Sequence, residues 1–141
     1  MMYFIDVEIN RKMLGKLLTT KSVKSHMVED GKAALDVVCN DMNAYRIIFM
    51  DNLMPVMSGV EATMRLRAAG YPYLIVGLTG NVMVDEVDEY LRAGANMIFS
   101  KPLKSNLLNM LISHVKLNGP LAEPHMILIE KNDKFIWSVL P

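Results

Sequence analysis

The chain contains little cysteine, no long hydrophobic run and no basic leader segment. Its 141 residues include a single cysteine, Cys39, which excludes an internal disulfide and is typical of a protein in a reducing compartment. Because Cys39 falls in a helical pattern, we expect it to be a small buried residue. No apolar stretch approaches the roughly 20 residues that cross a membrane. We therefore expect no membrane contact and a cytoplasmic location.

The chain also lacks an excess of charge of either sign. Fifteen basic residues balance fifteen acidic ones, and no run of Lys and Arg is longer than two. Proteins that hold the phosphate backbone of a nucleic acid concentrate positive charge on one face. We therefore expect no nucleic-acid binding by this chain. Its length fits one compact domain with a sizeable core.

Short apolar runs alternate with amphipathic stretches from residue 1 to about residue 117, which is the pattern of βα units around a parallel sheet. We count five units. Right-handed crossovers with helices on both faces favour a flavodoxin-like (βα)₅ fold with strand order 2-1-3-4-5. The expected strands cover residues 3–5, 23–28, 47–50, 74–78 and 96–100, and the first and fifth helices cover residues 10–19 and 103–115.

The ends of the intervening helices are marked by residues with defined roles. Asp30 opens the second helix, and Ser58 with Glu61 forms a capping box at the start of the third. Gly70 and Gly94 stand where the third and fourth helices should end, because glycine adopts the left-handed conformation that terminates many helices.

A different pattern begins after the last predicted helix. Residues 119–124 are rich in glycine and proline and indicate a linker, while residues 126–129 and 135–140 flank a polar segment and predict a β-hairpin. We expect residues 1–118 to form one domain and residues 119–141 a linker and tail. Because an isolated hairpin is only marginally stable, it would lie on the domain, pair with the sheet edge of another chain, or be a segment foreign to the native protein. The oligomeric state stays open.

Polar side chains follow four of the expected strands at the point where each strand ends. Asp6 follows the first strand, Asp51 the third, Thr79 the fourth and Lys101 the fifth. Ligands of open α/β sheets bind outside the carboxyl ends of the strands, and the order 2-1-3-4-5 would bring these residues together there. Taken singly, each has an ordinary explanation as a turn, helix-cap or solvated residue.

Asp6 and Asp51 would place two carboxylates in one cleft, where they repel each other unless one is protonated or a cation lies between them. Mg²⁺ is suitable because it binds one or two carboxylates, retains several waters and also binds a phosphate oxygen. A phosphoryl group in transfer carries negative charge that Mg²⁺, Lys101 and the Thr79 hydroxyl would neutralise. A carboxylate oxygen of Asp51 is then the nucleophile, and the product is an acyl phosphate.

Residues 1 to about 117 resemble the receiver domains of two-component response regulators, and most of all the receivers attached to hybrid sensor histidine kinases. The resemblance rests on four segments: Asp6 with Asn10 to Leu14, Met50 and Asp51 with Met54, Pro55 and Met57 to Gly59, Leu78 to Asn81, and Lys101 with Pro102. It implies the (βα)₅ fold and the transfer of a phosphoryl group from a partner's phosphohistidine to Asp51. It also implies a Mg²⁺ ion bound by Asp6, Asp51 and the backbone carbonyl of Leu53, with Thr79 and Lys101 as catalytic residues.

The chain departs from the family pattern at two positions. Receivers usually carry two adjacent acids after the first strand, whereas Ile5 precedes Asp6 here, so we expect weakened Mg²⁺ affinity. Many receivers carry a Tyr or Phe three residues before the lysine, where this chain has Ile98. An aliphatic side chain cannot rotate in the same way, so the coupling of Thr79 to the surface around the fourth helix, the fifth strand and the fifth helix is open to question.

Three functions are compatible with these residues. The first is a signalling phosphoacceptor, with no activity beyond its own phosphoryl transfer and autodephosphorylation, to which a histidine kinase or histidine phosphotransfer protein docks at Arg11, Leu14 and Lys16. The second is a degenerate receiver that binds proteins independently of phosphorylation. The third is a phosphohydrolase of the haloacid dehalogenase type, which is disfavoured because Leu53 occupies the position of the second Asp which that reaction needs.

Overall fold

The protein is described from a computed structural model, which covers residues 3–7, 24–28, 30–51, 56–79, 84–100, 109–111, 113, 126–131 and 134–139. For the first two strands and the last two, the backbone is described but the side chains, apart from Val28, are not. The predicted helix over residues 10–19 lies outside these ranges. No helix among the described residues is long and apolar enough to cross a membrane.

The described strands form one sheet of seven, in the order β2-β1-β3-β4-β5-β6-β7. Neighbouring strands from β2 through to β6 run parallel, and only β6 and β7 are antiparallel. The predicted order 2-1-3-4-5 is therefore confirmed. The strands are β1 Tyr3–Val7, β2 Lys24–Val28, β3 Tyr45–Asp51, β4 Leu74–Thr79, β5 Met97–Ser100, β6 Met126–Lys131 and β7 Lys134–Val139.

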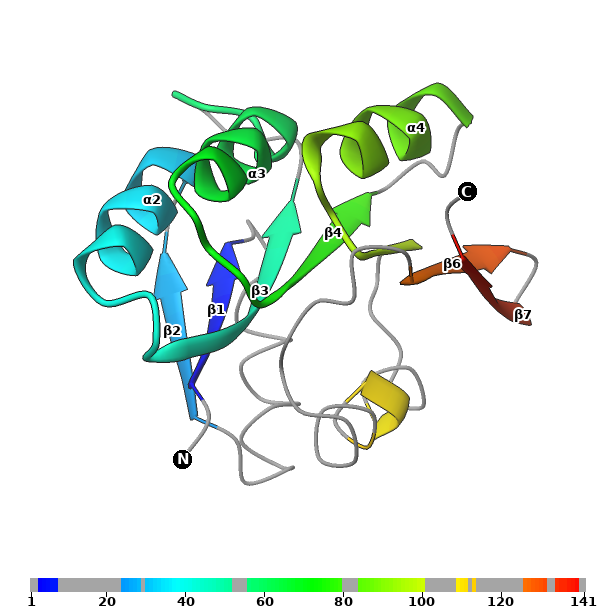
Figure 1. The fold of residues 1–141 in the computed structure, drawn as a ribbon, viewed down its shortest axis with the longest axis horizontal. Helices are drawn as coiled ribbons and strands as arrows, with labels where there is room; N and C mark the ends of the chain where they lie inside the picture. Colours follow the sequence, from blue (N-terminus) through cyan, green and yellow to red (C-terminus); the bar gives the residue numbers. More distant parts are fainter. Residues whose placement is uncertain are drawn as a thin grey trace.

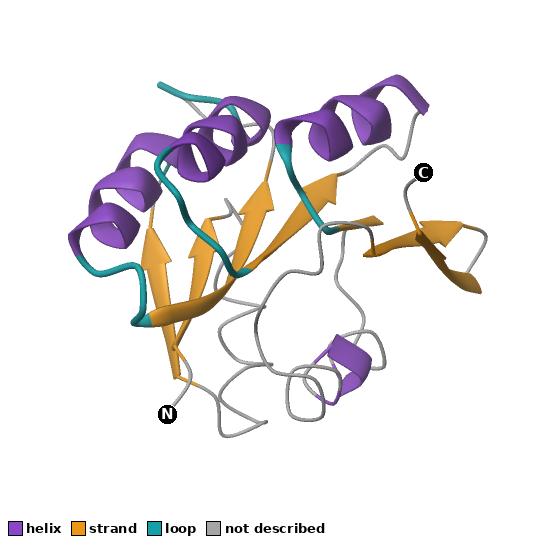
Figure 2. Cartoon of the chain, viewed as in Figure 1, coloured by secondary structure: helices purple, strands orange, loops and turns teal. Residues whose placement is uncertain are grey.

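Three helices lie side by side on one face of the sheet (Figures 1 and 2). They are α2 (Gly31–Asn40), α3 (Gly59–Ala68) and α4 (Val84–Ala93). The helical residues near 110, yellow in Figure 1, lie on the opposite face, and Leu111 among them is buried. A fifth helix is predicted over residues 103–115. Of these, the structure describes residues 109–111 and 113, and they are helical. Described helical residues thus lie on both faces of the sheet, the arrangement that a parallel sheet requires.

The helix ends follow the predicted local rules. The Asp30 side chain accepts a hydrogen bond from the Ala33 amide at 2.8 Å, and the Ser58 hydroxyl accepts one from the Glu61 amide at 3.2 Å. Gly70 and Gly94 have φ angles of 95° and 113°, in the left-handed region where a side chain would be strained. Asp30 and Ser58 therefore cap the amino ends of α2 and α3, and the two glycines follow the carboxyl ends of α3 and α4.

The centre of the core is formed by β3 and β4. All six residues of Leu74–Thr79 are buried, and so are Ile47–Met50 on the neighbouring strand. Such continuous burial explains why both segments read as unbroken apolar runs instead of alternating ones.

The prediction that Cys39 is buried is wrong, since its thiol is free and exposed. Helix α2 buries Gly31, Ala34 and Val38 against its neighbours. Cys39 is one residue beyond Val38, which turns its side chain by about 100° around the helix axis. It lies in the last turn next to Asn40, which is also exposed. The apolar face of α2 therefore ends at Val38.

The predicted hairpin is confirmed, and it extends this chain's own sheet. Strand β6 pairs parallel with β5, with Met97 opposite Leu128 and Ile98 opposite Ile129. Strand β7 then pairs antiparallel with β6 along its whole length. Pairing with β5 gives the hairpin the third strand that an isolated hairpin lacks.

The Arg67 side chain joins α3 to the amino ends of β4 and β5. The sequence pattern did not indicate this role of Arg67. Its Nε donates to the Gly94 carbonyl at 2.9 Å, and its Nη1 donates to the carbonyls of Tyr71 and Tyr73, both at 2.8 Å. Its Nη2 donates to Asn96 Oδ1 at 2.6 Å. Burial lowers the pKa of this guanidinium, with Tyr71 acting in the opposite direction. Main-chain carbonyl groups and the side-chain oxygen of Asn96 thus solvate the charge of Arg67.

Asn96 continues this network into the sheet. Its Oδ1 also accepts a hydrogen bond from the Ile75 main-chain amide at 3.0 Å, and the main-chain amide of Asn96 donates to the Ile75 carbonyl at 2.9 Å. The loops that lead into β4 and β5 are therefore held together through one arginine and one asparagine.

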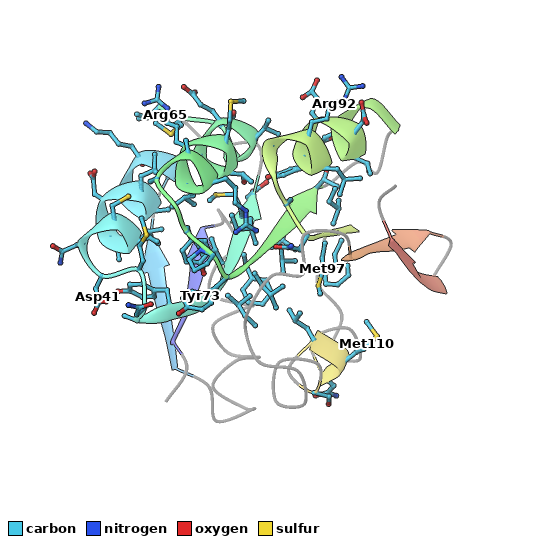
Figure 3. All side chains as sticks on the ribbon, viewed as in Figure 1. Asp41, Arg65, Tyr73, Arg92, Met97 and Met110 are labelled. Carbon is cyan, nitrogen blue, oxygen red and sulfur yellow. The ribbon has the colours of Figure 1, made fainter. Side chains whose placement is uncertain are left out.

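We predict that Arg67→Met destabilises the domain by about 3 kcal/mol, because carbonyl groups and the Asn96 amide lose a donor that water only partly replaces. The matched control is Arg65→Met on the same helix. Arg65 is exposed and forms a surface ion pair with Glu61 at 3.0 Å, which contributes about 0.5 kcal/mol. Figure 3 shows Arg65 pointing away from the sheet. Urea unfolding of both variants measures the difference, and equal losses would contradict the assigned role of Arg67.

Candidate functional site

Asp51 lies at the carboxyl end of β3, at the end of the buried segment Ile47–Met50. Its side chain is only 1% exposed. In the pairing of β3 with β4, Asp51 stands opposite Leu78, and the next residue of β4 is Thr79. The Thr79 side chain is 2% exposed. The sheet therefore brings the predicted nucleophile and the predicted hydroxyl to the same edge.

Asp6 lies on β1, which flanks β3 on its other side. The pairing places Asp6 opposite Phe49, two residues before Asp51. The side chain of Asp6 lies outside the described part of the structure, but its backbone is on the strand adjacent to the nucleophile. Two predicted acids thus belong to neighbouring strands near one edge of the sheet.

The other predicted site residues lie outside the described ranges. Lys101 directly follows Ser100, which is level with Thr79 in the pairing of β4 with β5. Leu53 and the predicted docking residues Arg11, Leu14 and Lys16 also lie outside the described ranges.

The acids at this edge suit a hard cation with few protein ligands. Among the described residues there is no group of three or more His, Cys, Asp and Glu side chains that could hold a metal. The side chain of Asp6 lies outside those residues. One carboxylate from β3 and one from β1 would be a small set of oxygen donors, which is enough for Mg²⁺ because this ion retains several of its waters. The donor chemistry therefore fits Mg²⁺.

Tyr90 on α4 contacts the backbone next to Asp51, and the sequence pattern did not identify it. Its side chain is completely buried, and its hydroxyl donates to the Met50 carbonyl at 2.9 Å. Burial raises the pKa of this hydroxyl well above its ordinary value, and the charges of Asp51 and Glu86 raise it further. The Tyr90 hydroxyl therefore remains protonated and acts as a donor.

Two glycines make room for the Tyr90 side chain. A Cβ on Gly77 would lie 3.1 Å from Cδ1 of the Tyr90 ring. A Cβ on Gly59, the first residue of α3, would collide with both the Tyr90 hydroxyl and the Asp51 carbonyl. A glycine within the continuous apolar run Leu74–Leu78 was the available signal, because glycine inside a strand often marks the close approach of another group.

Ile98, where the sequence departs from the receiver pattern, lies on β5. Its side chain is completely buried and belongs to the same core cluster as Tyr90 and Met50. Ile98 therefore packs in the core. The aromatic side chain that contacts the backbone next to Asp51 is Tyr90 of α4.

Comparison with known proteins agrees with the fold. The family model for the response regulator receiver domain matches residues 6–113. Two-component response regulator 24 of Arabidopsis thaliana is 40% identical to the chain over 107 residues, covering 75% of this chain and 76% of that protein. Hybrid signal transduction histidine kinase I of Dictyostelium discoideum is 31% identical over 115 residues, covering 77% of this chain but 7% of the kinase.

A solved structure similar to this chain contains a metal ion. It is the receiver domain of a sensor histidine kinase from Pseudomonas aeruginosa, determined with a magnesium ion coordinated in its active-site cleft. The two chains superpose with a TM-score of 0.72 at 27% identity, over 80% of this chain and 95% of the other. The similarity thus extends over nearly the whole of that domain.

We predict that Gly59→Ala destabilises the protein by about 2 kcal/mol or more, because the added methyl group forces the Asp51 backbone and Tyr90 apart in a close-packed region. Gly70→Ala is the matched control, since a Cβ there meets no atom within 4 Å and only the φ of 95° opposes it. That strain costs about 1 kcal/mol. Thermal and urea unfolding provide the comparison. A smaller loss for Gly59→Ala than for Gly70→Ala would show that the region around Asp51 can expand freely.

Proposed function

The chain belongs to the response regulator receiver domain family, and from that membership we propose that Asp51 is the residue which accepts the phosphoryl group. Receiver domains are phosphoacceptors in two-component and phosphorelay signalling, and in general they are not classical enzymes. The observation that carries the assignment to Asp51 is its position, buried at the carboxyl end of β3 and next to the strand that ends in Thr79.

In the proposed reaction, a carboxylate oxygen of Asp51 attacks the phosphorus of a phosphohistidine on the partner. The bond between phosphorus and the imidazole nitrogen breaks, its electron pair stays on that nitrogen, and an acyl phosphate forms on Asp51. Lys101 and the Thr79 hydroxyl bind the oxygens of the phosphoryl group as their charge develops. Attack of water on the acyl phosphate later returns Asp51 to its free form, which is the autodephosphorylation that we propose for this chain.

We propose that Mg²⁺ is bound by the carboxylates of Asp6 and Asp51 and by the Leu53 carbonyl. When bound, the ion neutralises charge on the phosphoryl oxygens. Mg²⁺ binding is general to the family, and the three ligands are inferred from the receiver pattern and from the adjacency of β1 and β3. Because Ile5 replaces an acid beside Asp6, this chain should bind Mg²⁺ more weakly than a receiver with both acids.

Receiver domains interact with histidine kinases or histidine phosphotransfer proteins. We propose that the partner of this chain docks on residues 10–19, through Arg11, Leu14 and Lys16. Residues 1–118 would carry the activity, since the family model matches residues 6–113. A cytoplasmic location is in keeping with the single exposed thiol of Cys39, which a reducing compartment would keep free.

The first test is phosphorylation of the isolated chain. Incubation with Mg²⁺ and phosphoramidate should add one phosphoryl group, detected by intact mass, and Asp51→Asn should abolish the adduct because an amide cannot act as the nucleophile. Asp41→Asn is the control, because Asp41 is an exposed acid at the end of α2. An adduct that survives Asp51→Asn would refute the site assignment. No adduct on the native chain would favour the phosphorylation-independent binding module.

A second test concerns the metal. Restoring the missing acid with Ile5→Asp should lower the Mg²⁺ concentration for half-maximal phosphorylation by about tenfold, because an outer-sphere acid holds a water that is bound to the ion. Ile5→Asn adds a polar side chain of the same size without the charge and should have a smaller effect. Mg²⁺ titrations of the phosphorylation rate measure all three proteins. An unchanged titration in Ile5→Asp would show that position 5 has no part in metal binding.

A further inference from the structure

Two tyrosine hydroxyls bind carbonyl groups at opposite ends of β3. The Tyr71 hydroxyl donates to the Tyr45 carbonyl at the amino end of the strand, and the Tyr90 hydroxyl donates to the Met50 carbonyl at the carboxyl end. Both donor-to-acceptor distances are 2.9 Å, and both side chains are at most 2% exposed. The two bonds are chemically equivalent, but only one of them is adjacent to Asp51.

Tyr90 reaches this position from a different element. It lies on α4, its ring packs on Gly77 of β4, and a Cβ on Gly59 of α3 would collide with both its hydroxyl and the Asp51 carbonyl. The Tyr90 hydroxyl thus lies where three elements meet behind the proposed nucleophile. Movement of the ring would displace the Met50 carbonyl, and the carboxylate of the next residue would move with it.

We propose that Tyr90 is a positioning residue for phosphoryl transfer, which fixes the carboxyl end of β3 so that the Asp51 carboxylate is held in line with the incoming phosphorus. This role rests on the proposed function of Asp51. A nucleophile must be held close to its reactive geometry, since small displacements reduce the rate of attack. Tyr90 acts through the backbone and does not touch the phosphoryl donor. Its contribution should therefore appear in the maximal rate and leave the binding of the donor unaffected.

The experiment compares Tyr90→Phe with Tyr71→Phe in the full chain. Each variant loses one buried hydroxyl and one hydrogen bond to a β3 carbonyl, so general loosening of the strand should be similar in both. Phosphorylation of Asp51 is followed by intact mass at saturating Mg²⁺ over a range of phosphoramidate concentrations. Urea unfolding gives the free energy of unfolding, so that rates are compared per folded molecule.

We expect Tyr90→Phe to form the adduct with a maximal rate about two- to tenfold below that of the native chain, which is the range that the net contribution of one hydrogen bond would give. The phosphoramidate concentration for half-maximal rate should be unchanged. Tyr71→Phe should lose stability but keep the native rate. Gly77→Ala, which retains the hydroxyl but crowds the Tyr90 ring, should also lower the maximal rate.

Other outcomes would overturn the proposal. Equal maximal rates for the native chain and Tyr90→Phe, or equal rate losses in Tyr90→Phe and Tyr71→Phe, would show that Tyr90 is only part of the core. A change confined to the half-maximal concentration would assign Tyr90 to donor binding instead. If the native chain itself forms no adduct, the phosphoacceptor function is refuted, and the positioning role with it. If the native chain forms the adduct and Tyr90→Phe has the same kinetics, only the positioning role is refuted.

Discussion

Burial of the Asp51 side chain is the constraint on which the arrangement of the surrounding elements depends. A carboxylate that is 1% exposed has exchanged most of its water for protein neighbours, and an uncompensated charge in a protein interior is strongly destabilising. Adjacent strands of a parallel sheet end together at its carboxyl edge, so a hydroxyl such as Thr79 can lie near the carboxylate there, whereas a second acid such as Asp6 would need a cation between the two carboxylates. The order of this sheet places β1 on one side of β3 and β4 on the other. Asp6 and Thr79 therefore come to the edge where Asp51 is buried.

The same constraint extends to the helices behind the site. Protein interiors are close-packed, so a large side chain on one element requires small residues on those that face it. Tyr90 supplies the large side chain, and Gly77 and Gly59 are the small residues opposite it. The position of α4 is consequently tied to the end of β3. Ile98 is packed in the core, and the hydrogen bond of Tyr90 is a direct physical link between the backbone next to Asp51 and a helix on the surface.

The sequence was sufficient for the features that depend on short-range rules. The alternating pattern limited the topology, because right-handed crossovers leave few sheet orders, and Asp30 and Ser58 cap helices by binding amides only three residues away. Arg67 and Tyr90 could not be found in this way. Gly94 lies 27 residues from Arg67, and Met50 lies 40 residues from Tyr90. In both cases the acceptor is a main-chain carbonyl, which every residue possesses and no sequence pattern marks.

The hairpin changes which part of the sheet is open to another strand. Without it, β5 would present unpaired amide and carbonyl groups only one strand away from β4, whose last residue is Thr79. With it, the outermost described strands are β2 and β7. The two added strands move the outermost strand on the β5 side roughly 10 Å further from the centre of the sheet. Another chain that extends the sheet on this side would therefore pair with β7, and such association would leave the strands around Asp51 undisturbed.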